Sequence, residues 1–401
     1  MPAIVIVGAG QAGASLAAKL RTLGYQGALT LVGEEPHAPY QRPPLSKGYL
    51  LGEMDLDRLY LRAPAFWAEQ NVTLRLGAHV SSIDPAAKTV TVGGETLSYD
   101  QLALTTGARP RTLPAEIGGS LANVFTVRTL ADVDRMAPAF RAGARVLIVG
   151  GGYIGLEAAA VAAKLGLSVT LIEAAPRILQ RVAAPETSAY FRALHAAHGV
   201  TILEGTGLER LLGTGAVSGA RLADGHELAA DLVIAGIGIL PNSELAQAAG
   251  LALENGILTD AFGRTTDPAI WAAGDCASFP RHGGRVRLES VGNAIDQAEL
   301  VAENMLGAAK AYDAKPWFWS DQYDTKLQIA GLNTGYDQIV TRASDTATSF
   351  WYYRGADLLA VDAMNDSRAY MIGKRLIEMG KSPDPAIIAN PATDLKALLK
   401  A

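Results

Sequence analysis

The sequence predicts an α/β protein in which two similar strand–turn–helix units each begin a parallel sheet, followed by a smaller α+β domain. The first observation is a glycine-rich turn that occurs twice, after the apolar runs 4–7 and 146–149, with an Ala-rich helix expected after each copy. The second observation is a change of pattern from about residue 316 onward. There, short alternating segments precede a predicted helix near 370–379.

Both turns match the GxGxxG pattern of a dinucleotide-binding unit. Their glycines are Gly8, Gly10 and Gly13 in the first copy and Gly150, Gly152 and Gly155 in the second. Such glycines allow a tight turn, let the backbone approach a pyrophosphate and pack the helix onto the strand, while the helix N-terminus faces the anion. A single GxGxxG is weak evidence, but two in the same context predict two dinucleotide sites.

An acidic residue closes the next predicted strand in each unit. Glu34 follows the stretch 29–33, and Glu173 follows 169–172. A carboxylate at this place accepts hydrogen bonds from an adenosine ribose. The competing interpretation is a polar residue that merely ends a strand, and the upstream fingerprint makes it the weaker one. One chain with two such sites suggests two dinucleotides that exchange electrons.

Composition excludes several classes of protein. A length of 401 residues indicates two or three domains, and a net charge of −5 argues against a general nucleic-acid binder. The single cysteine, Cys276, excludes an intrachain disulfide or a dithiol relay, and we expect it to be buried. His195 and His198 lie one predicted helical turn apart and are expected on a solvated helix face, so no metal site is predicted. The chain enters its first strand directly after residue 3 and contains no uncharged apolar stretch long enough for a bilayer, so we expect a cytoplasmic protein.

Six segments resemble the FAD-dependent ferredoxin reductases of bacterial oxygenase systems, of the putidaredoxin reductase and biphenyl dioxygenase reductase types. They are PYQRPPLSK at 39–47, TGARPR at 106–111, GGGYIGLE at 150–157, AGIGILPN at 235–242, GD at 274–275 and PWFWSDQ at 316–322. The PPLSK and PWFWSDQ segments are specific to this group, whereas GxGxxG and Gly-Asp are shared with all relatives of glutathione reductase. The resemblance covers essentially the whole chain.

This resemblance implies a glutathione reductase-like fold with two Rossmann-like domains. An FAD domain at 1–109 and 240–315 would contain an inserted NAD domain at 110–239, and a C-terminal α+β domain at 316–401 would cover the flavin. The implied reaction is oxidation of NADH by FAD, with delivery of single electrons to a 2Fe–2S ferredoxin. That ferredoxin would serve a haem monooxygenase or a ring-hydroxylating dioxygenase.

The resemblance also implies which residues surround each cofactor. For FAD they are Gly8, Gly10, Ala12, Gly13, Glu34, Arg42, Lys47, Val80, Thr106, Gly107, Arg128, Asp275, Val291 and Trp319. For NAD they are Gly150, Gly152, Ile154, Gly155, Glu157, Glu173, Arg177, Gly236, Ile237 and Gly238. Trp319 is equally compatible with simple packing, whereas for Asp275 a helix cap is the weaker alternative.

Lys47 and Glu157 are the predicted catalytic residues. The resemblance places Lys47 beside the flavin nitrogen that receives the hydride, where a cation favours the reduced ring. It pairs Lys47 with Glu157 of the second glycine-rich segment. The residues alone leave a plainer alternative open, in which Lys47 is a surface lysine and Glu157 a first-turn acid that complements the helix dipole.

Glu173 favours NADH over NADPH, because a carboxylate that accepts the ribose 2′-hydroxyl repels a 2′-phosphate. Arg177, four residues later, would partly offset that repulsion.

An acidic ferredoxin requires a basic face on its reductase. The candidates are Arg281, Arg285 and Arg287 in a Gly-rich hairpin, together with Arg42, and ordinary solvated charges are the competing interpretation.

Three other functions fit parts of the pattern. An NADH oxidase or peroxidase of this fold needs a cysteine near the PPLSK segment, where the chain has Ser46 and Lys47. A rubredoxin reductase is a close alternative, because the acceptor surface is poorly encoded. A non-enzymatic NADH sensor resembling apoptosis-inducing factor would carry targeting and C-terminal insertions that this sequence lacks.

Overall fold

The computed structural model describes residues 1–400 of the chain, and these residues form two compact units. The first unit comprises Met1–Arg42, Asp55–Arg109 and Leu240–Pro316. The second comprises Pro43–Met54, Pro110–Ile239 and the chain from Trp317 onward. The predicted α/β class with a C-terminal α+β part is confirmed, whereas the three-domain boundaries stay a prediction.

A five-stranded parallel sheet forms the centre of the first unit, in the order β19-β7-β1-β2-β3. Its strands are β1 (Ile4–Val7), β2 (Leu29–Val32), β3 (Thr73–Arg75), β7 (Gln101–Leu104) and β19 (Ile270–Ala272). β1 lies in the middle of this sheet and is buried at all four positions. A central parallel strand that is covered on both faces has no place for a polar side chain, which explains its apolar sequence.

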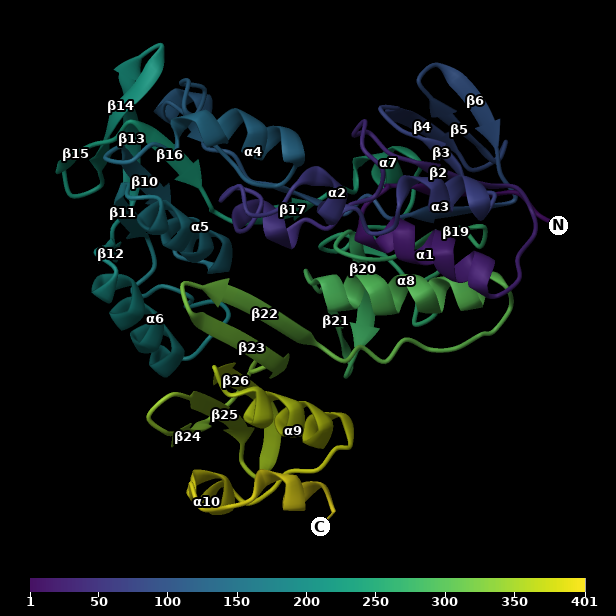
Figure 1. Ribbon diagram of the computed structural model, residues 1–401. Coiled ribbons are helices and arrows are strands. Elements are labelled where there is room, and N and C mark those ends of the chain that lie inside the picture. Colours follow the sequence, from purple (N-terminus) through teal and green to yellow (C-terminus); the bar gives the residue numbers. More distant parts are fainter. Residues whose placement is uncertain (401) are drawn as a thin grey trace. The chain divides into compact units, whose positions relative to one another are not determined.

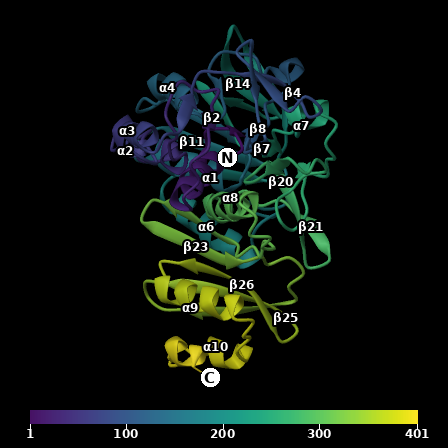
Figure 2. The same ribbon diagram turned by 90° about the vertical axis from the view of Figure 1, so that its right-hand side faces the viewer.

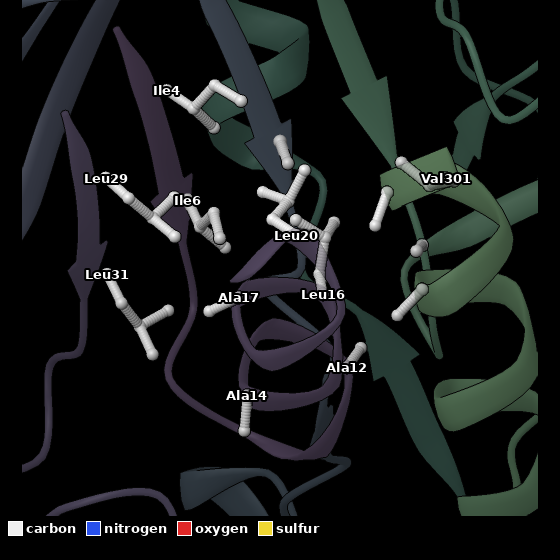
Figure 3. Packing of buried hydrophobic residues seen from close by; sticks show 14 of the residues in the cluster. Ile4, Ile6, Ala12, Ala14, Leu16, Ala17, Leu20, Leu29, Leu31 and Val301 are labelled. Atoms are coloured by element: carbon white, nitrogen blue, oxygen red, sulfur yellow. The ribbon is translucent and has the colours of Figure 1, made fainter. Parts of the chain in front are cut away.

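Alternate residues of β1 pack into two different cores. Ile4 and Ile6 face α1 (Gln11–Thr22) and α8 (Val291–Met305), as Figure 3 shows. These two helices lie side by side in Figure 1. Val5 and Val7 belong to the core on the other face, which includes residues of a three-stranded antiparallel sheet. The strands of that sheet are β4 (Val80–Asp84), β5 (Thr89–Val92) and β6 (Glu95–Ser98).

Shorter elements complete the first unit. They are α2 (Leu56–Leu59), α3 (Pro64–Glu69), α7 (Glu244–Ala248), β18 (Ile257–Leu258), β20 (Ala277–Arg281) and β21 (Gly284–Val286). The chain passes from one unit to the other in the short strands β8 (Ala108–Pro110) and β17 (Ile239–Pro241).

The second unit repeats the parallel-sheet design, in the order β12-β11-β10-β16-β9. Its strands are β9 (Val124–Phe125), β10 (Arg145–Val149), β11 (Ser168–Glu173), β12 (Thr201–Glu204) and β16 (Leu232–Ala235). Its helices are α4 (Leu130–Met136), α5 (Tyr153–Lys164) and α6 (Pro185–Ala197). A three-stranded antiparallel sheet is attached to them, formed by β13 (Leu208–Thr214), β14 (Ala216–Leu222) and β15 (Glu227–Ala229).

The C-terminal part is a five-stranded antiparallel sheet in the order β22-β23-β26-β25-β24. Its strands are β22 (Trp317–Gln322), β23 (Thr325–Gly331), β24 (Gln338–Ala343), β25 (Thr348–Arg354) and β26 (Asp357–Met364). Helix α9 (Ser367–Glu378) packs against β26 and β23, and both views show it along the sheet (Figures 1 and 2). The short α10 (Pro385–Ala389) follows it. The helix predicted near 370–379 therefore exists and begins three residues earlier.

Two predictions about single residues have different outcomes. Cys276 is fully buried, as predicted. The prediction that His195 lies on a solvated helix face is wrong, because its side chain is completely buried, at 0% exposure. The helix face that carries His195 is covered by residues of β22 and the turn after it, which are more than 120 residues away in the sequence.

Candidate active site

The first glycine-rich turn connects β1 to α1. Gly8 has a φ of +115°, and a Cβ atom there would overlap the carbonyl oxygen of Thr105. A Cβ atom on Gly13 would overlap the carbonyl oxygen of Gly8, so the helix packs as closely as the backbone allows. Gly10 differs, because no described atom lies within 4 Å of the position its Cβ would take. The space beside Gly10, at the N-terminus of α1, is therefore open to an anion.

The second turn, between β10 and α5, repeats this geometry. Gly150 has a φ of +110°, and its Cβ would overlap the carbonyl oxygen of Gly236. A Cβ on Gly155 would overlap the carbonyl oxygen of Gly150, and the position beside Gly152 is again open among the described residues. Both turns therefore have the two tight glycines that build the loop and the one open glycine that a pyrophosphate needs.

The two predicted ribose acids differ in how they are held. Glu34 follows β2, is 79% exposed and lies 3.2 Å from His79, measured from Oε1 to Nδ1. Glu173 ends β11 and is oriented by two backbone amides, since Oε2 accepts from Gly151 N and Oε1 from Ala175 N, each at 2.7 Å. Each carboxylate oxygen of Glu173 keeps a free lone pair for a ribose hydroxyl. The open glycines and the two carboxylates thus fit a bound dinucleotide.

Arg177 is engaged elsewhere in the second unit. Its Nη1 atom donates to the hydroxyl of Ser188 at 2.6 Å. The same serine hydroxyl donates to Ile178 O at 2.6 Å, which ties the loop after β11 to helix α6. Ile154, by contrast, is 45% exposed in the first turn of α5.

Asp275 lies next to the first turn. The preceding Gly274 has a φ of +82°, and a Cβ atom on it would come within 2.9 Å of the Ala12 side chain. The Gly274-Asp275 segment and the N-terminus of α1 are therefore adjacent. Arg42 belongs to the same unit and donates to Glu35 Oε1 at 2.6 Å and to the Tyr40 hydroxyl at 3.0 Å.

The other predicted FAD residues fall into both units. The first unit contains Val80 at the start of β4, Thr106 and Gly107 after β7, and Val291 at the start of α8. The second unit contains Arg128, Lys47 and Trp319. Trp319 stacks on Trp317, with ring centroids 5.5 Å apart and planes inclined by 21°. The predicted NAD residues Gly236, Ile237 and Gly238 follow β16, and Gly238 has a φ of +100°.

Lys47 and Glu157 form a partly buried ion pair in the second unit. Lys47 Nζ lies 2.6 Å from Glu157 Oε2, and the side chains are 20% and 6% exposed. The 3-10 helix η1 (Pro43–Ser46) positions Lys47, and α5 positions Glu157. The plainer alternative, in which Lys47 is a surface lysine and Glu157 a first-turn acid of the helix, is therefore wrong.

The carboxylate of Glu157 has two further donors, which the sequence reasoning missed. Ser46 Oγ donates to Oε2 at 3.0 Å, and Ser320 Oγ donates to Oε1 at 2.7 Å. Both serines are buried. Each lies inside a segment that is specific to the resembled group, PPLSK and PWFWSDQ, and this was the available signal.

Two of the arginines proposed for ferredoxin docking form hydrogen bonds or ion pairs with other residues of the chain. Arg285 donates to the carbonyl oxygens of Thr259 and Ser278. Arg287 is 8% exposed, donates to Asp275 O at 3.0 Å and pairs with Glu289 at 2.6 Å. Both guanidinium groups therefore have partners within the protein, and the docking role of these arginines stays a prediction. Burial also lowers the pKa of Arg281.

Residues 1–400 meet neither of two simple requirements, those of a membrane-spanning helix and of a metal site. No helix in that range is long and apolar enough to cross a membrane. The same residues contain no group of three or more His, Cys, Asp or Glu side chains placed to hold a metal ion.

Comparison with known proteins identifies the family. Residues 2–298 match the pyridine nucleotide-disulphide oxidoreductase family, and residues 317–399 match the reductase C-terminal family. The chain is 43% identical to a ferredoxin–NAD(P)(+) reductase of a Sphingomonas species, covering 98% of this chain and 96% of that protein. It is 42% identical to putidaredoxin reductase of Pseudomonas putida, covering 99% and 97%.

A solved structure supports the same assignment. The reductase in the crystal structure of the covalent putidaredoxin reductase–putidaredoxin complex superimposes with a TM-score of 0.96 at 41% identity, covering 100% of this chain and 98% of that one. Members of this family use FAD and NAD(P)H. The chain belongs to the pyridine nucleotide-disulphide oxidoreductases, as an NADH-dependent flavoprotein of the ferredoxin reductase type.

Proposed function

We propose that this protein oxidises NADH through bound FAD and reduces a 2Fe–2S ferredoxin that serves a haem monooxygenase or a ring-hydroxylating dioxygenase. One hydride carries two electrons, each ferredoxin accepts one, and one proton is released for every NADH. The observation that carries the proposal is the pair of matching pyrophosphate turns in one chain, each with an open glycine and a ribose acid. The related proteins named above are ferredoxin reductases, which supports the same acceptor class.

FAD supplies the conversion between a hydride and single electrons when it is bound. The residues of the chain hold the two cofactors and set the charge around the flavin. We assign the FAD pyrophosphate to the turn at Gly8–Gly13 with Glu34 and Asp275 for its hydroxyl groups. We assign the NADH pyrophosphate to the turn at Gly150–Gly155, with Glu173 for the ribose.

Lys47 is the residue that we assign to the flavin ring. An ammonium group has three N–H donors, and among the described residues Glu157 Oε2 takes one at 2.6 Å and Pro43 O takes another at 3.3 Å. The third donor remains for a flavin acceptor atom. The carboxylate of Glu157 compensates the charge of Lys47 before NADH reacts. The protein can therefore hold this ammonium group beside the flavin site without leaving its charge unpaired.

Glu173 is the residue that we assign to the choice of NADH. The amides of Gly151 and Ala175 fix its carboxylate at the end of β11. A fixed negative charge repels a 2′-phosphate. Arg177 binds Ser188, so its guanidinium is not free to neutralise that phosphate without giving up this bond.

The alternative functions predict different behaviour. An NADH peroxidase needs a thiol beside the flavin, and the single cysteine is buried against the carbonyl oxygens of Leu104 and Ala273. Rubredoxin reduction would use the same cofactors with another acceptor. A sensor would hold reduced flavin with NAD for a long time. We place the enzyme in the cytoplasm, where NADH is supplied.

The deciding experiment is NADH-driven cytochrome c reduction by the purified flavoprotein, with no carrier, with a 2Fe–2S ferredoxin and with a rubredoxin. A large increase with the ferredoxin alone supports the proposal. A larger increase with rubredoxin favours that acceptor, and brisk oxygen consumption without any carrier favours an oxidase. Bleached flavin without turnover favours the sensor.

A further inference from the structure

A chain of buried hydrogen bonds runs from Tyr323 to the carboxylate of Glu157. The Tyr323 hydroxyl lies 3.0 Å from His195 Nδ1, and His195 Nε2 lies 2.8 Å from Gln322 Oε1. Gln322 Nε2 then donates to Ser320 Oγ at 3.0 Å, and Ser320 Oγ donates to Glu157 Oε1 at 2.7 Å. His195, Gln322 and Ser320 are all 0% exposed.

The direction of every bond in this chain follows from its chemistry. Ionised Glu157 accepts only, so Ser320 must donate to it. Ser320 oxygen then accepts from the amide group of Gln322, whose carbonyl oxygen must accept from a proton on His195 Nε2. With that proton on Nε2, the other ring nitrogen accepts from the Tyr323 hydroxyl. All four donors therefore point toward Glu157.

Three elements of the second unit bring these residues together. Ser320 and Gln322 alternate along β22 and so project from the same face of the strand. His195 comes from the last turn of α6, and Glu157 from α5. Burial lowers the pKa of His195, in agreement with a neutral ring that both donates and accepts.

The backbone is strained at Tyr323, where the chain of hydrogen bonds begins. Tyr323 has a φ of +56°, a left-handed conformation that is unfavourable for an aromatic residue. Its ring stacks on His198, with centroids 3.6 Å apart and planes inclined by 10°. Strain of this kind persists only where surrounding contacts hold it, and here those contacts direct the Tyr323 hydroxyl to His195.

We infer that His195 and Gln322 are positioning residues for the reduction of FAD by NADH, acting on Lys47 through Ser320 and Glu157. The inference rests on the role proposed above for Lys47. Oε2 of Glu157 already accepts from Lys47 and Ser46, so Ser320 is the donor that fixes the other oxygen. If the Ser320 hydroxyl turns away, the carboxylate is free to rotate, and Lys47 loses its fixed position.

The direct test reads the proton on His195 by long-range ¹H–¹⁵N NMR of the FAD-loaded protein with ¹⁵N-labelled histidine. The signal is assigned by its loss in His195→Gln. We expect the proton on Nε2 and no titration between pH 6.5 and 8, with a changed Nδ1 shift in Tyr323→Phe. His198→Phe is the matched control, because it keeps the stacked ring and should leave the His195 signal unchanged. A proton on Nδ1, or titration in that pH range, overturns the inference.

The functional test measures the limiting rate of flavin reduction by NADH in rapid mixing. Ser320→Ala and His195→Phe should each lower that rate about tenfold, the effect of one lost hydrogen bond to a charged group, with the NADH dissociation constant within about twofold of wild type. His195→Gln should retain most of the rate, because its amide supplies a donor near the Nε2 position. FAD content and melting temperature are measured for every variant, and the small Ser320→Ala change keeps the test valid if His195→Phe is unstable.

Lys47→Met separates this inference from the proposed function. If Lys47→Met slows flavin reduction while Ser320→Ala and His195→Phe do not, the positioning chain is refuted and the role of Lys47 stands. If Lys47→Met has no effect on that rate, the proposed role of Lys47 fails. An equal loss in His195→Gln and His195→Phe would also refute the chain, because a purely structural site does not distinguish a donor from an apolar ring.

Discussion

Asp362 is a buried carboxylate whose removal should stabilise the protein at neutral pH. It lies on β26 and is 1% exposed. The hydroxyls of Tyr352 and Thr187 donate to its Oδ2 atom, the latter at 2.8 Å, and Thr187 belongs to α6. Burial raises the pKa of Asp362 to about 6, because two neutral donors only partly replace the lost hydration.

The sign and size of the effect follow from this shift. A pKa raised above the ordinary aspartate value of 3.8 means that the folded state holds the proton of Asp362 more tightly than the unfolded state does. The contribution of this proton to the free energy of unfolding is fully present below about pH 4 and is lost as the pH rises through about 6. A shift of roughly two units corresponds to about 3 kcal/mol at pH 7. Asp362→Asn, which is neutral at every pH, should stabilise the protein by about 1–3 kcal/mol at pH 7.5, the lower figure allowing for an amide oxygen that accepts the two hydroxyl bonds less strongly than a carboxylate does.

Hydrogen exchange read by mass spectrometry is the appropriate assay, since a chain with two compact units need not unfold in one step. We expect slower exchange of the β25 and β26 amides in Asp362→Asn than in wild type at pH 7.5, and a difference that shrinks toward pH 5 after correction for the intrinsic rate. Ser344→Ala, on an exposed turn of the same sheet, serves as the control. The reasoning would be refuted if Asp362→Asn and wild type were equally protected at both pH values, or if Asp362→Asn exchanged faster than wild type at pH 7.5.

Three further predictions concern the cofactor sites and the arginines. Glu173→Ala should reduce the preference for NADH over NADPH by about tenfold, because a fixed charge is removed; unchanged kcat/KM ratios for the two nucleotides would contradict this. Gly13→Ala should lower the FAD content of the purified protein, whereas Gly155→Ala should keep FAD and raise the NADH dissociation constant at least about tenfold, since each Cβ overlaps a carbonyl oxygen of its own turn. Arg285→Ala should destabilise the fold by about 1–3 kcal/mol and reduce ferredoxin and ferricyanide turnover alike; a loss confined to ferredoxin would support its docking role.

The two pyrophosphate turns could be predicted from sequence because their geometry is local. A Cβ atom at Gly8 or Gly13 would overlap the backbone of the same turn or of the adjacent strand. Only glycine fits these two positions, so the glycine pattern reports the geometry directly. The same holds for Glu173, which follows its strand and binds the amides of its own loops. The glycine pattern therefore located both turns, and the strand end that follows the second turn located Glu173.

The rest of the candidate site depends on contacts that no local pattern contains. His195 is buried by Gln322 and Tyr323, which lie 127 and 128 positions away. Arg285 looks like a surface charge in a Gly-rich hairpin, and only the folded chain shows the carbonyl oxygens that it binds. The pairing of Lys47 with Glu157, 110 residues apart, came from the family resemblance and not from spacing.

The three donors on Glu157 suggest how one helix can serve both nucleotide binding and the charge of Lys47. A carboxylate that accepts only one hydrogen bond can rotate about its terminal C–C bond, and the ammonium group paired with it is then free to move. Here Ser46 and Lys47 hold one oxygen while Ser320 holds the other, so the plane of the carboxylate is fixed. Glu157 lies in the second turn of α5, the helix whose N-terminus forms the second glycine turn. A small shift of α5 on nucleotide binding would therefore be transmitted to Lys47 through rigid hydrogen bonds, whereas a solvated Glu–Lys pair would absorb it.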